Sequence, residues 1–177
     1  MLEQKIIVIN TSPLIALVAA WGTLEPLRRL YAAVHVPAEV AEEICRGGDT
    51  NFAIPEFMAA DFLQKAQQPV QISPFLANSL DRGEAAVIQL ALDKGIETVC
   101  IDEAIGRRVA RLNGLTLTGS TGVLVRYKQE HPEFSLAQAI QRMQARGIRL
   151  GVEVIEFALR HDIDVQQQPR PESNGLH

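Results

Sequence analysis

The chain has 177 residues, of which 47% are hydrophobic and 21% charged, and 17 basic against 21 acidic side chains give a formal net charge of −4. This length suits one domain, or one domain with an appendage, and the hydrophobic fraction excludes a disordered chain. The negative charge argues against a protein that coats nucleic acid by charge alone, although acidic residues are also the residues that hold metal.

The termini and the cysteines indicate a cytoplasmic protein. The first residues lack the basic start and the apolar stretch of a secretory signal, and the apolar run at 14–21 is far shorter than the roughly 20 residues that cross a bilayer. Cys45 and Cys100 belong to no CxxC motif, so we expect two reduced, packed thiols. The polar composition of residues 165–177 predicts a flexible tail.

Strand and helix signals alternate along the first half of the chain. The first strand is a continuous β-branched apolar run, which is typical of a central strand buried on both faces. Hydroxyl residues before Pro13 favour a helix start, and Gly47 and Gly48 end a later helix. In chain order we expect a strand at 5–10, a helix from residue 12, a helix at 24–31, a strand at 33–36, a helix at 38–46, a weaker helix at 55–65 and a short strand at 70–72.

The second half shows the same alternation more clearly. Strands alternating with helices at this spacing form right-handed βαβ units, which predicts an α/β fold with a mostly parallel sheet covered on both faces. In chain order we expect a helix at 83–94, a strand at 98–101, a helix at 103–112, a strand at 115–118 and helices at 123–130, 136–146 and 152–161.

Polar residues end the predicted strands, at the edge of the sheet where open α/β proteins bind ligands. Asn10 ends the first strand, Asp102 follows the strand at 98–101, and residues 118–121 follow the last strand. Because the carboxyl ends of parallel strands meet at one edge, we expect these residues to lie on a common rim.

Two helices add carboxylates to this rim. Glu84 lies in the first turn of a helix, where the helix dipole favours an acid. Only one of Glu42 and Glu43 can face the rim, and we favour Glu43 because it lies three positions after the apolar Val40. Oxygen ligands without His or Cys suit a hard cation such as Mg²⁺ or Mn²⁺, which can orient water during phosphodiester cleavage.

Each of these residues also has an ordinary structural explanation. Glu84 can serve only as an acid at a helix N-terminus, and Glu42 or Glu43 can lie on a solvated helix face. Asp102 can cap the helix that follows it. Their joint placement favours the metal site, but the residues alone leave both interpretations open.

Five segments in the range 5–128 carry a family resemblance. They are INTSPLI at 9–15, VP at 36–37 with Glu43 downstream, RGEAAVI at 82–88, IDE at 101–103 followed by RRVA at 107–110, and TGSTGVL at 118–124. Together they resemble the PIN-domain superfamily, and more narrowly its uncharacterised branch of predicted nucleic-acid-binding proteins related to VapC-type toxins. The resemblance implies a three-layer α/β/α sandwich with a five-stranded, mostly parallel sheet, and a Mg²⁺- or Mn²⁺-dependent ribonuclease site.

The resemblance also assigns site residues by position. The metal-binding quartet falls on Asn10, Glu43, Glu84 and Asp102, with the three acids as catalytic residues, and the small hydroxyl residue falls on Ser120 or Thr118. Asn10 departs from the pattern, because most active members carry Asp there. An amide brings no charge and should weaken divalent binding, which puts activity in question but not the fold.

Basic residues cluster directly after Asp102. Arg107 and Arg111 are four positions apart on one helix face, and we expect them, with Arg108, Ser12 and Ser120, to contact the RNA backbone. The alternative is a solvated helix face. Apart from Tyr127, no aromatic residue accompanies the arginines, so base stacking is not expected.

The expected organisation is a PIN-like α/β domain at 1–130 and C-terminal helices at 131–164 that pack on this domain or on a dimer partner. The leading hypothesis is a metal-dependent endoribonuclease that cleaves RNA phosphodiester bonds, as the candidate toxin of a toxin–antitoxin pair. Its expected partners are single-stranded or structured RNA, an antitoxin protein and a second copy of the chain, with no membrane.

Three other interpretations remain. The first is a catalytically weak or inactive PIN domain that acts as an RNA-binding or protein-interaction module. The second is a phosphate binder that uses residues 118–122, which lack the Lys and the spacing of a P-loop. The third is a receiver-type signalling domain, but that fold needs clustered acids after the first strand, where this chain has Ile9, Asn10 and Thr11.

Overall fold

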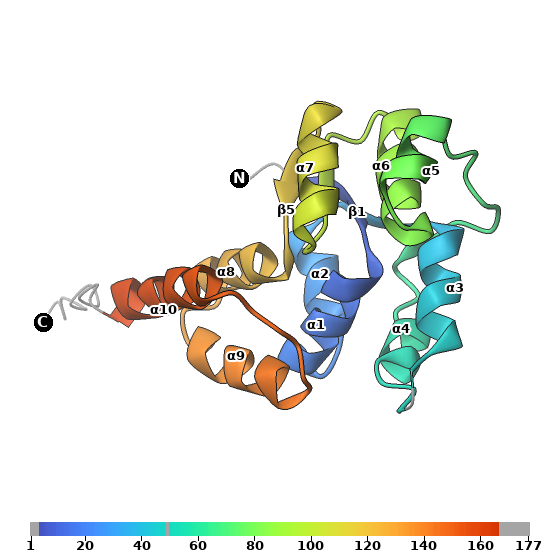
Figure 1. Ribbon diagram of the computed structural model, residues 1–177. Helices are drawn as coiled ribbons and strands as arrows, with labels where there is room; N and C mark the ends of the chain where they lie inside the picture. Colours follow the sequence, from blue (N-terminus) through green and yellow to red (C-terminus); the bar gives the residue numbers. More distant parts are fainter. Residues whose placement is uncertain (1–3, 49, 167–177) are drawn as a thin grey trace, which may run out of the picture.

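The computed structural model describes residues 4–48 and 50–166, with side chains described up to residue 162. Residues 167–177, which make up most of the predicted tail, lie outside the described residues. Across the described ranges, five strands form one parallel sheet with the order β3-β2-β1-β4-β5 (Figure 1). The strands are β1 (Ile6–Ile9), β2 (Ala33–Val36), β3 (Gln64–Lys65), β4 (Thr98–Cys100) and β5 (Thr116–Thr118).

The strand β1 lies at the centre of the sheet. Ile7 pairs with Val34 of β2 on one side and with Thr98 of β4 on the other. Ile7, Val8 and Ile9 are fully buried, as expected for a continuous apolar run covered on both faces. The predicted α/β fold with a five-stranded parallel sheet is therefore confirmed.

Helices cover the sheet in two groups. Those in the described part of the chain are α1 (Thr11–Trp21), α2 (Glu25–Leu30), α3 (Ala38–Arg46), α4 (Ile54–Ala59), α5 (Pro74–Ser79), α6 (Arg82–Lys94), α7 (Ala104–Leu112), α8 (Ser120–Glu130), α9 (Leu136–Ala145) and α10 (Val152–Gln166). In one group α6 packs on β1 and β4, and α7 packs on β5, whereas in the other α1 packs against α8 and α9. The sheet and these two groups make the three layers of the sandwich (Figure 1).

The segment between α3 and α6 differs from the sequence prediction. The predicted helix at 55–65 ends at Ala59, and the edge strand forms at Gln64–Lys65, where Lys65 pairs with Val36. The predicted strand at 70–72 is wrong. The backbone N–H of Val70 donates to the buried Glu39 side chain at 2.9 Å, so a helix side chain, rather than a neighbouring strand, satisfies the backbone there.

The C-terminal helices pack on the same body. Arg142 of α9 donates a hydrogen bond to the carbonyl of Ala20 in α1 at 2.8 Å. A buried ion pair joins α8 to α10, with 3.0 Å between Lys128 Nζ and Asp162 Oδ1. The Asp162 carboxylate also accepts hydrogen bonds from two backbone N–H groups at the start of α9. One carboxylate therefore holds α8, α9 and α10 together.

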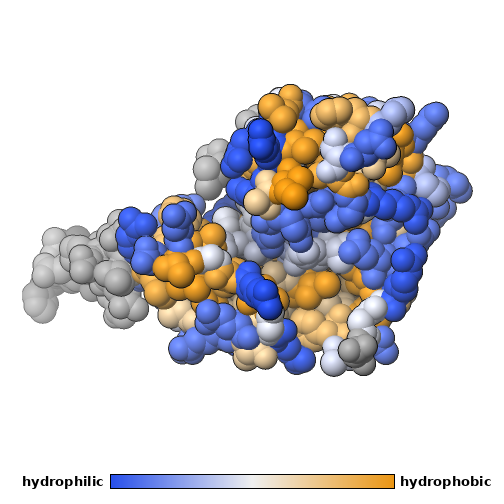
Figure 2. All heavy atoms as spheres, in the orientation of Figure 1, coloured by the Kyte–Doolittle hydropathy of each residue, from blue (hydrophilic) through white to orange (hydrophobic). Residues whose placement is uncertain are grey.

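The helix α10 extends away from the sheet and keeps part of its apolar surface exposed. Figure 2 shows hydrophobic residues gathered over this helix, and the exposed ones are Val152, Val154, Phe157 and Leu159. Among the helices of the described residues, none combines the length and apolar character needed to span a membrane.

Candidate active site

Asn10 stands where β1 meets α1, at the carboxyl edge of the sheet. Its backbone N–H donates to the carbonyl of Cys100 in β4 at 3.0 Å, which fixes the residue between the two central strands. Although Asn10 is the N-cap residue of α1, its side chain makes no capping hydrogen bond. The side chain is buried, and within the described structure its Oδ1 atom has no hydrogen-bond partner. Helix capping therefore does not explain this amide.

Glu43, rather than Glu42, turns toward Asn10. Its Oε2 atom accepts a hydrogen bond from Thr11 Oγ1 at 3.0 Å. A Cβ atom placed on Gly83 would lie 2.7 Å from Glu43 Oε2 and 3.4 Å from Asn10 Oδ1, so both side chains converge on the first turn of α6. Glu42 instead forms an exposed ion pair with Arg82 at 3.1 Å.

Glu84 is buried beneath the start of α7. Its Oε1 atom lies against Gly106, where an added Cβ would be only 2.6 Å away, and it has no hydrogen-bond partner in the described structure. Burial, and after it the negative charges of Asp81 and Glu103, raise the pKa of Glu84 to about 7. Near neutral pH this carboxyl group is therefore partly protonated.

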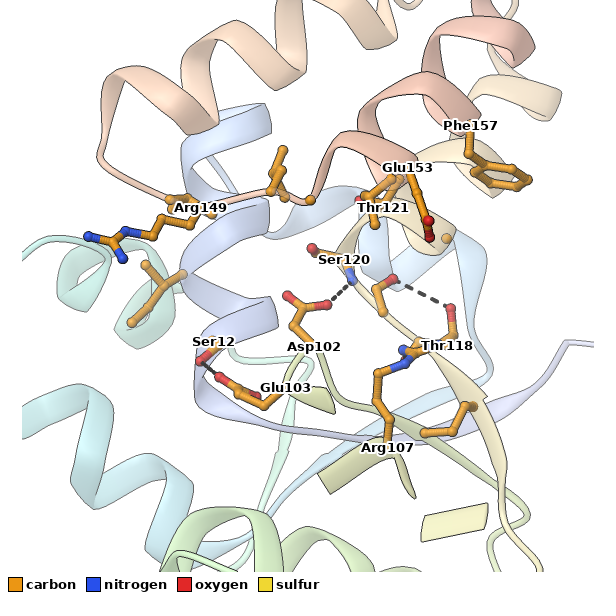
Figure 3. Close-up of a pocket in the computed structure, with 18 residues that line it drawn as sticks. Ser12, Asp102, Glu103, Arg107, Thr118, Ser120, Thr121, Arg149, Glu153 and Phe157 are labelled. Atoms are coloured by element: carbon orange, nitrogen blue, oxygen red, sulfur yellow. Dashed lines mark hydrogen bonds between the residues drawn. The ribbon is translucent and has the colours of Figure 1, made fainter. Parts of the chain in front are cut away.

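Asp102 lies on the other side of α7, after β4. Its Oδ1 atom accepts a hydrogen bond from the backbone N–H of Ser120 at 2.8 Å (Figure 3). Burial raises the pKa of Asp102, although the hydrogen bonds from Ser120 and the positive charge of Arg107 oppose this effect. The contact ties the end of β4 to the start of α8.

The predicted site residues thus fall into two adjacent groups. Asn10 and Glu43 converge on the first turn of α6, which contains Glu84, while Asp102 and Ser120 lie at the ends of β4 and β5. Within residues 4–48 and 50–166, no group of three or more His, Cys, Asp and Glu side chains is arranged so that it could hold a metal ion. The donors nevertheless suit a hard cation, because all are oxygen atoms and two of them are buried without a hydrogen bond.

Two further acids belong to this edge, and sequence reasoning missed them. Asp81 is the N-cap of α6 and accepts a hydrogen bond from the backbone N–H of Glu84 at 2.8 Å. Glu103 accepts a hydrogen bond from the hydroxyl of Ser12, which joins α7 to α1. The first could have been found from the Asp-x-x-Glu spacing of a helix start, and the second from its place beside Asp102.

The predicted RNA-binding arginines differ in their surroundings. Arg107 Nη1 donates to the carbonyls of Ile101 at 2.7 Å and Thr118 at 3.1 Å, so this guanidinium group already joins β4 to β5. Arg108 and Arg111 are exposed on α7. Only Arg107 of the three lines the larger cavity beside Asp102.

Two cavities reach the acidic edge, and different acids line them. The larger, of about 820 Å³, contains Ser12, Asp102 and Ser120 in its wall and extends to α10 (Figure 3). The smaller, of about 550 Å³, is lined on its acidic side by Asp81, Glu84 and Glu103. Glu103 lines both cavities, so the acids separate two solvent-accessible spaces at the carboxyl edge of the sheet.

Comparison with known families agrees with this architecture. A family model described as a PIN domain matches residues 6–162, which is more than half of the chain, and the chain belongs to the PIN-domain family. The match confirms the predicted membership and extends past residue 128, where the sequence motifs end, to include α9 and most of α10. No curated protein and no solved structure matches the chain significantly. PIN domains have a nuclease-type fold and generally depend on divalent metal.

Proposed function

We propose that the protein is a divalent-metal-dependent endoribonuclease that hydrolyses RNA phosphodiester bonds. The observation that carries this proposal is the pair of buried oxygen atoms without hydrogen bonds, Asn10 Oδ1 and Glu84 Oε1, at the ligand-binding edge of the sheet. A buried acceptor left without a partner costs free energy, so such atoms are rare in folded proteins unless a ligand or ion satisfies them.

Asn10, Glu43, Glu84 and Asp102 are the residues that would hold Mg²⁺ or Mn²⁺. When bound, the ion supplies charge neutralisation at the phosphate and lowers the pKa of a water molecule. The hydroxyl of Thr11 orients Glu43, and the N–H of Ser120 orients Asp102. Glu84, whose pKa is about 7, would serve as a charged ligand in its deprotonated form.

The larger cavity supports RNA as the substrate. Ser12, Arg107 and Ser120 line it beside Asp102, and the exposed Arg108 and Arg111 continue on α7 as contacts for the backbone of single-stranded or structured RNA. These cations offset the acids at the edge, where phosphates would otherwise be repelled.

The biological setting is part of the same proposal. The resemblance to VapC-type toxins supports a toxin role, with an antitoxin protein and a second copy of the chain as partners. Cys100 is buried as predicted, whereas the prediction that Cys45 is packed is wrong because Cys45 is exposed; the two free thiols fit a reducing cytoplasm. Since α9 contacts α1 and α10 contacts α8, we also propose that residues 131–162 are part of the PIN domain itself.

One alternative has specific support. Asn10 carries no charge, and Glu43 Oε2 and Asp102 Oδ1 already accept hydrogen bonds within the protein. The described residues contain no ready metal-holding group of acids. These features favour a second candidate, a catalytically weak or inactive PIN domain that acts as an RNA-binding or protein-interaction module.

Cleavage of mixed single-stranded RNA in Mn²⁺ tests the two candidates. We expect cleavage by the wild-type protein, its loss on addition of a chelator, and its loss in Asp102→Ala. Asp61→Ala is the matched control, because Asp61 is exposed and lies outside the site. Cleavage that is undiminished in Asp102→Ala contradicts the ribonuclease mechanism, whereas RNA binding without any cleavage supports the inactive module.

A further inference from the structure

The larger cavity has a second wall that the acidic edge does not explain. The connector after α9 and the first turns of α10 close the cavity opposite Asp102, with Leu150, Glu153, Val154 and Phe157 among its lining residues. Figure 3 shows Phe157 on α10 across the cavity from Ser12 and Asp102. Sequence reasoning did not associate Phe157 with the arginines of α7, because it is distant from them along the chain and only the fold brings it into the same cavity as Arg107.

The two ends of the cavity differ in chemistry. Asp102, Arg107 and Ser120 make one end polar, whereas the α10 end carries the apolar side chains of Val154 and Phe157 beside the charged Glu153. The cavity volume of about 820 Å³ lies within the range of small-ligand sites, so it has room for a nucleotide. A polar end beside a hydrolytic site and an apolar end with an aromatic ring match the phosphate and the base of one nucleotide.

The aromatic ring is both exposed and held in position. Phe157 is 45% exposed, and its ring contacts the His161 ring one turn later, with 4.3 Å between the ring centroids. The buried ion pair of Lys128 and Asp162 fixes the same part of α10 to α8. An exposed ring on a helix that is anchored in this way loses little freedom when a base stacks on it.

The charges nearby set the direction of the nucleotide. Glu153 lies one turn before Phe157 and lines the same wall, so it disfavours a phosphate at the α10 end of the cavity. Arg149 is exposed at the mouth of the cavity, and no ion pair within residues 4–48 and 50–162 involves it. Arg107, Arg149 and Phe157 line different parts of the same cavity (Figure 3), so a strand with one base on the ring can bring neighbouring phosphates to the arginines.

We propose that the part of the cavity lined by Phe157 is a nucleotide subsite, in which an unpaired base of RNA stacks on Phe157 while Arg149, farther along the cavity, contacts a neighbouring phosphate. The subsite rests on the proposed function and specifies its substrate. That substrate is single-stranded RNA with an unstacked base next to the phosphate that is cleaved. A second copy of the chain is the other occupant to test, but the continuity of the cavity with Asp102 favours the nucleotide.

Equilibrium binding of RNA without cleavage tests the subsite. The probe is a short fluorescein-labelled single-stranded RNA of mixed sequence, titrated at low ionic strength in a chelator and followed by fluorescence anisotropy. We expect Phe157→Leu, which keeps an apolar side chain but loses the π-face, to weaken binding about tenfold, and Phe157→Trp to retain it. Phe75→Leu is the matched control, because Phe75 is an exposed aromatic residue on α5 that does not line this cavity.

The outcomes separate the subsite from the function on which it rests. Because the titration needs no turnover, an inactive enzyme that binds RNA still tests Phe157. If the wild-type protein does not bind RNA in the chelator, the subsite is wrong, whereas the proposed function is still decided by the cleavage assay in Mn²⁺. Equal RNA affinity in wild type and Phe157→Leu overturns the subsite alone. A Phe157→Leu protein whose mass by light scattering falls, with RNA affinity unchanged, assigns this face to a second copy and also overturns the subsite.

Discussion

At the scale of single residues, Asn10 decides how strongly the site attracts a cation. It ends the central strand and leaves a buried amide oxygen without a hydrogen bond, 3.4 Å from the Cβ position of Gly83 and close to Glu43. An amide oxygen can ligate a divalent ion, but it adds no charge to a partly desolvated site, where charge matters most. The remaining attraction comes from the carboxylates.

Restoring the charge at this position should strengthen ion binding. We expect Asn10→Asp to bind Mn²⁺ about tenfold more tightly than wild type, because the four proposed ligands would then all be carboxylates. Isothermal titration calorimetry measures the change, with Asn51→Asp as the control at an exposed asparagine outside the site. Equal or weaker affinity in Asn10→Asp would count against Asn10 as a ligand.

The raised pKa of Glu84 predicts that the stability of the metal-free protein depends on pH. Its pKa in the folded protein is about 7, above the ordinary value of 4.5, so the folded state holds this proton more tightly than the unfolded state does. The free energy of unfolding should therefore fall as the pH rises from about 4.5 to about 7, with the full penalty present above that range.

Glu84→Gln removes this titration. In a chelator, we expect its free energy of unfolding to vary less than that of wild type between about pH 5 and about pH 8, with a residual slope from Asp102. Urea unfolding across this pH range measures the difference. Identical slopes in the two proteins would show that Glu84 titrates normally.

The site residues differ in how far their positions and orientations could be predicted from the sequence. Strand ends and a helix start are local features, so Asn10, Glu84 and Asp102 could be placed on one edge from their positions alone. The orientation of Glu43 depends on the hydroxyl of Thr11, which is distant along the chain. From the sequence, Arg107 was predicted to contact phosphate. In the structure its Nη1 atom donates hydrogen bonds to two strand-end carbonyls, a role that depends on the spacing of β4 and β5.

At the scale of elements, helices and strands with strong periodic patterns could be predicted well from the sequence. The edge strand of the sheet could not. The strand β2 and the helix α3 have the predicted bounds, because apolar periodicity and glycine stops are local signals. The strand β3 has only two residues and forms by pairing with β2, so no local pattern marks it. The start of α8 at Ser120 follows from the backbone contact with Asp102 rather than from periodicity.

The helix α10 depends on one buried ion pair. Lys128 is 3% exposed by side chain and Asp162 is 11% exposed, and the Lys128 ammonium group also donates to the carbonyls of Pro132 and Phe134. Burial alone would raise the pKa of Asp162, but hydrogen bonds from Ala137, Lys128 and Leu136 outweigh it and lower the pKa. This carboxylate therefore stabilises the fold above its ordinary pKa, and the contribution is lost as the pH falls through its lowered value.

Removal of the ammonium group should weaken the fold. We expect Lys128→Met to lower the free energy of unfolding by about 3 kcal/mol, because Asp162 stays buried without its counter-charge. Arg28→Met, which breaks an exposed ion pair with Glu25, should cost less than about 1 kcal/mol and serves as the control. Urea unfolding at neutral pH compares them, and a loss for Lys128→Met no larger than for the control would contradict a structural role for the pair.

At the scale of the whole molecule, the net charge of −4 is a sum of unlike parts. Acids gather at the carboxyl edge of the sheet, and arginines follow on α7. The class of fold could be predicted from the alternation of strands and helices, because that pattern extends from the first strand to the last, over residues 6–118. The position of α10 beside the site could not, since it depends on the packing of three helices around Asp162.

The central claim is that the acidic edge holds a divalent ion, and calorimetric titration with Mn²⁺ tests it most directly. Near neutral pH, in buffers that differ in ionisation enthalpy, wild type should bind the ion saturably and release protons, because Glu84 is partly protonated when its pKa is about 7. Glu84→Gln should bind more weakly and release fewer protons. An absence of saturable binding by wild type, or binding and proton release that are unchanged in Glu84→Gln, would contradict the claim.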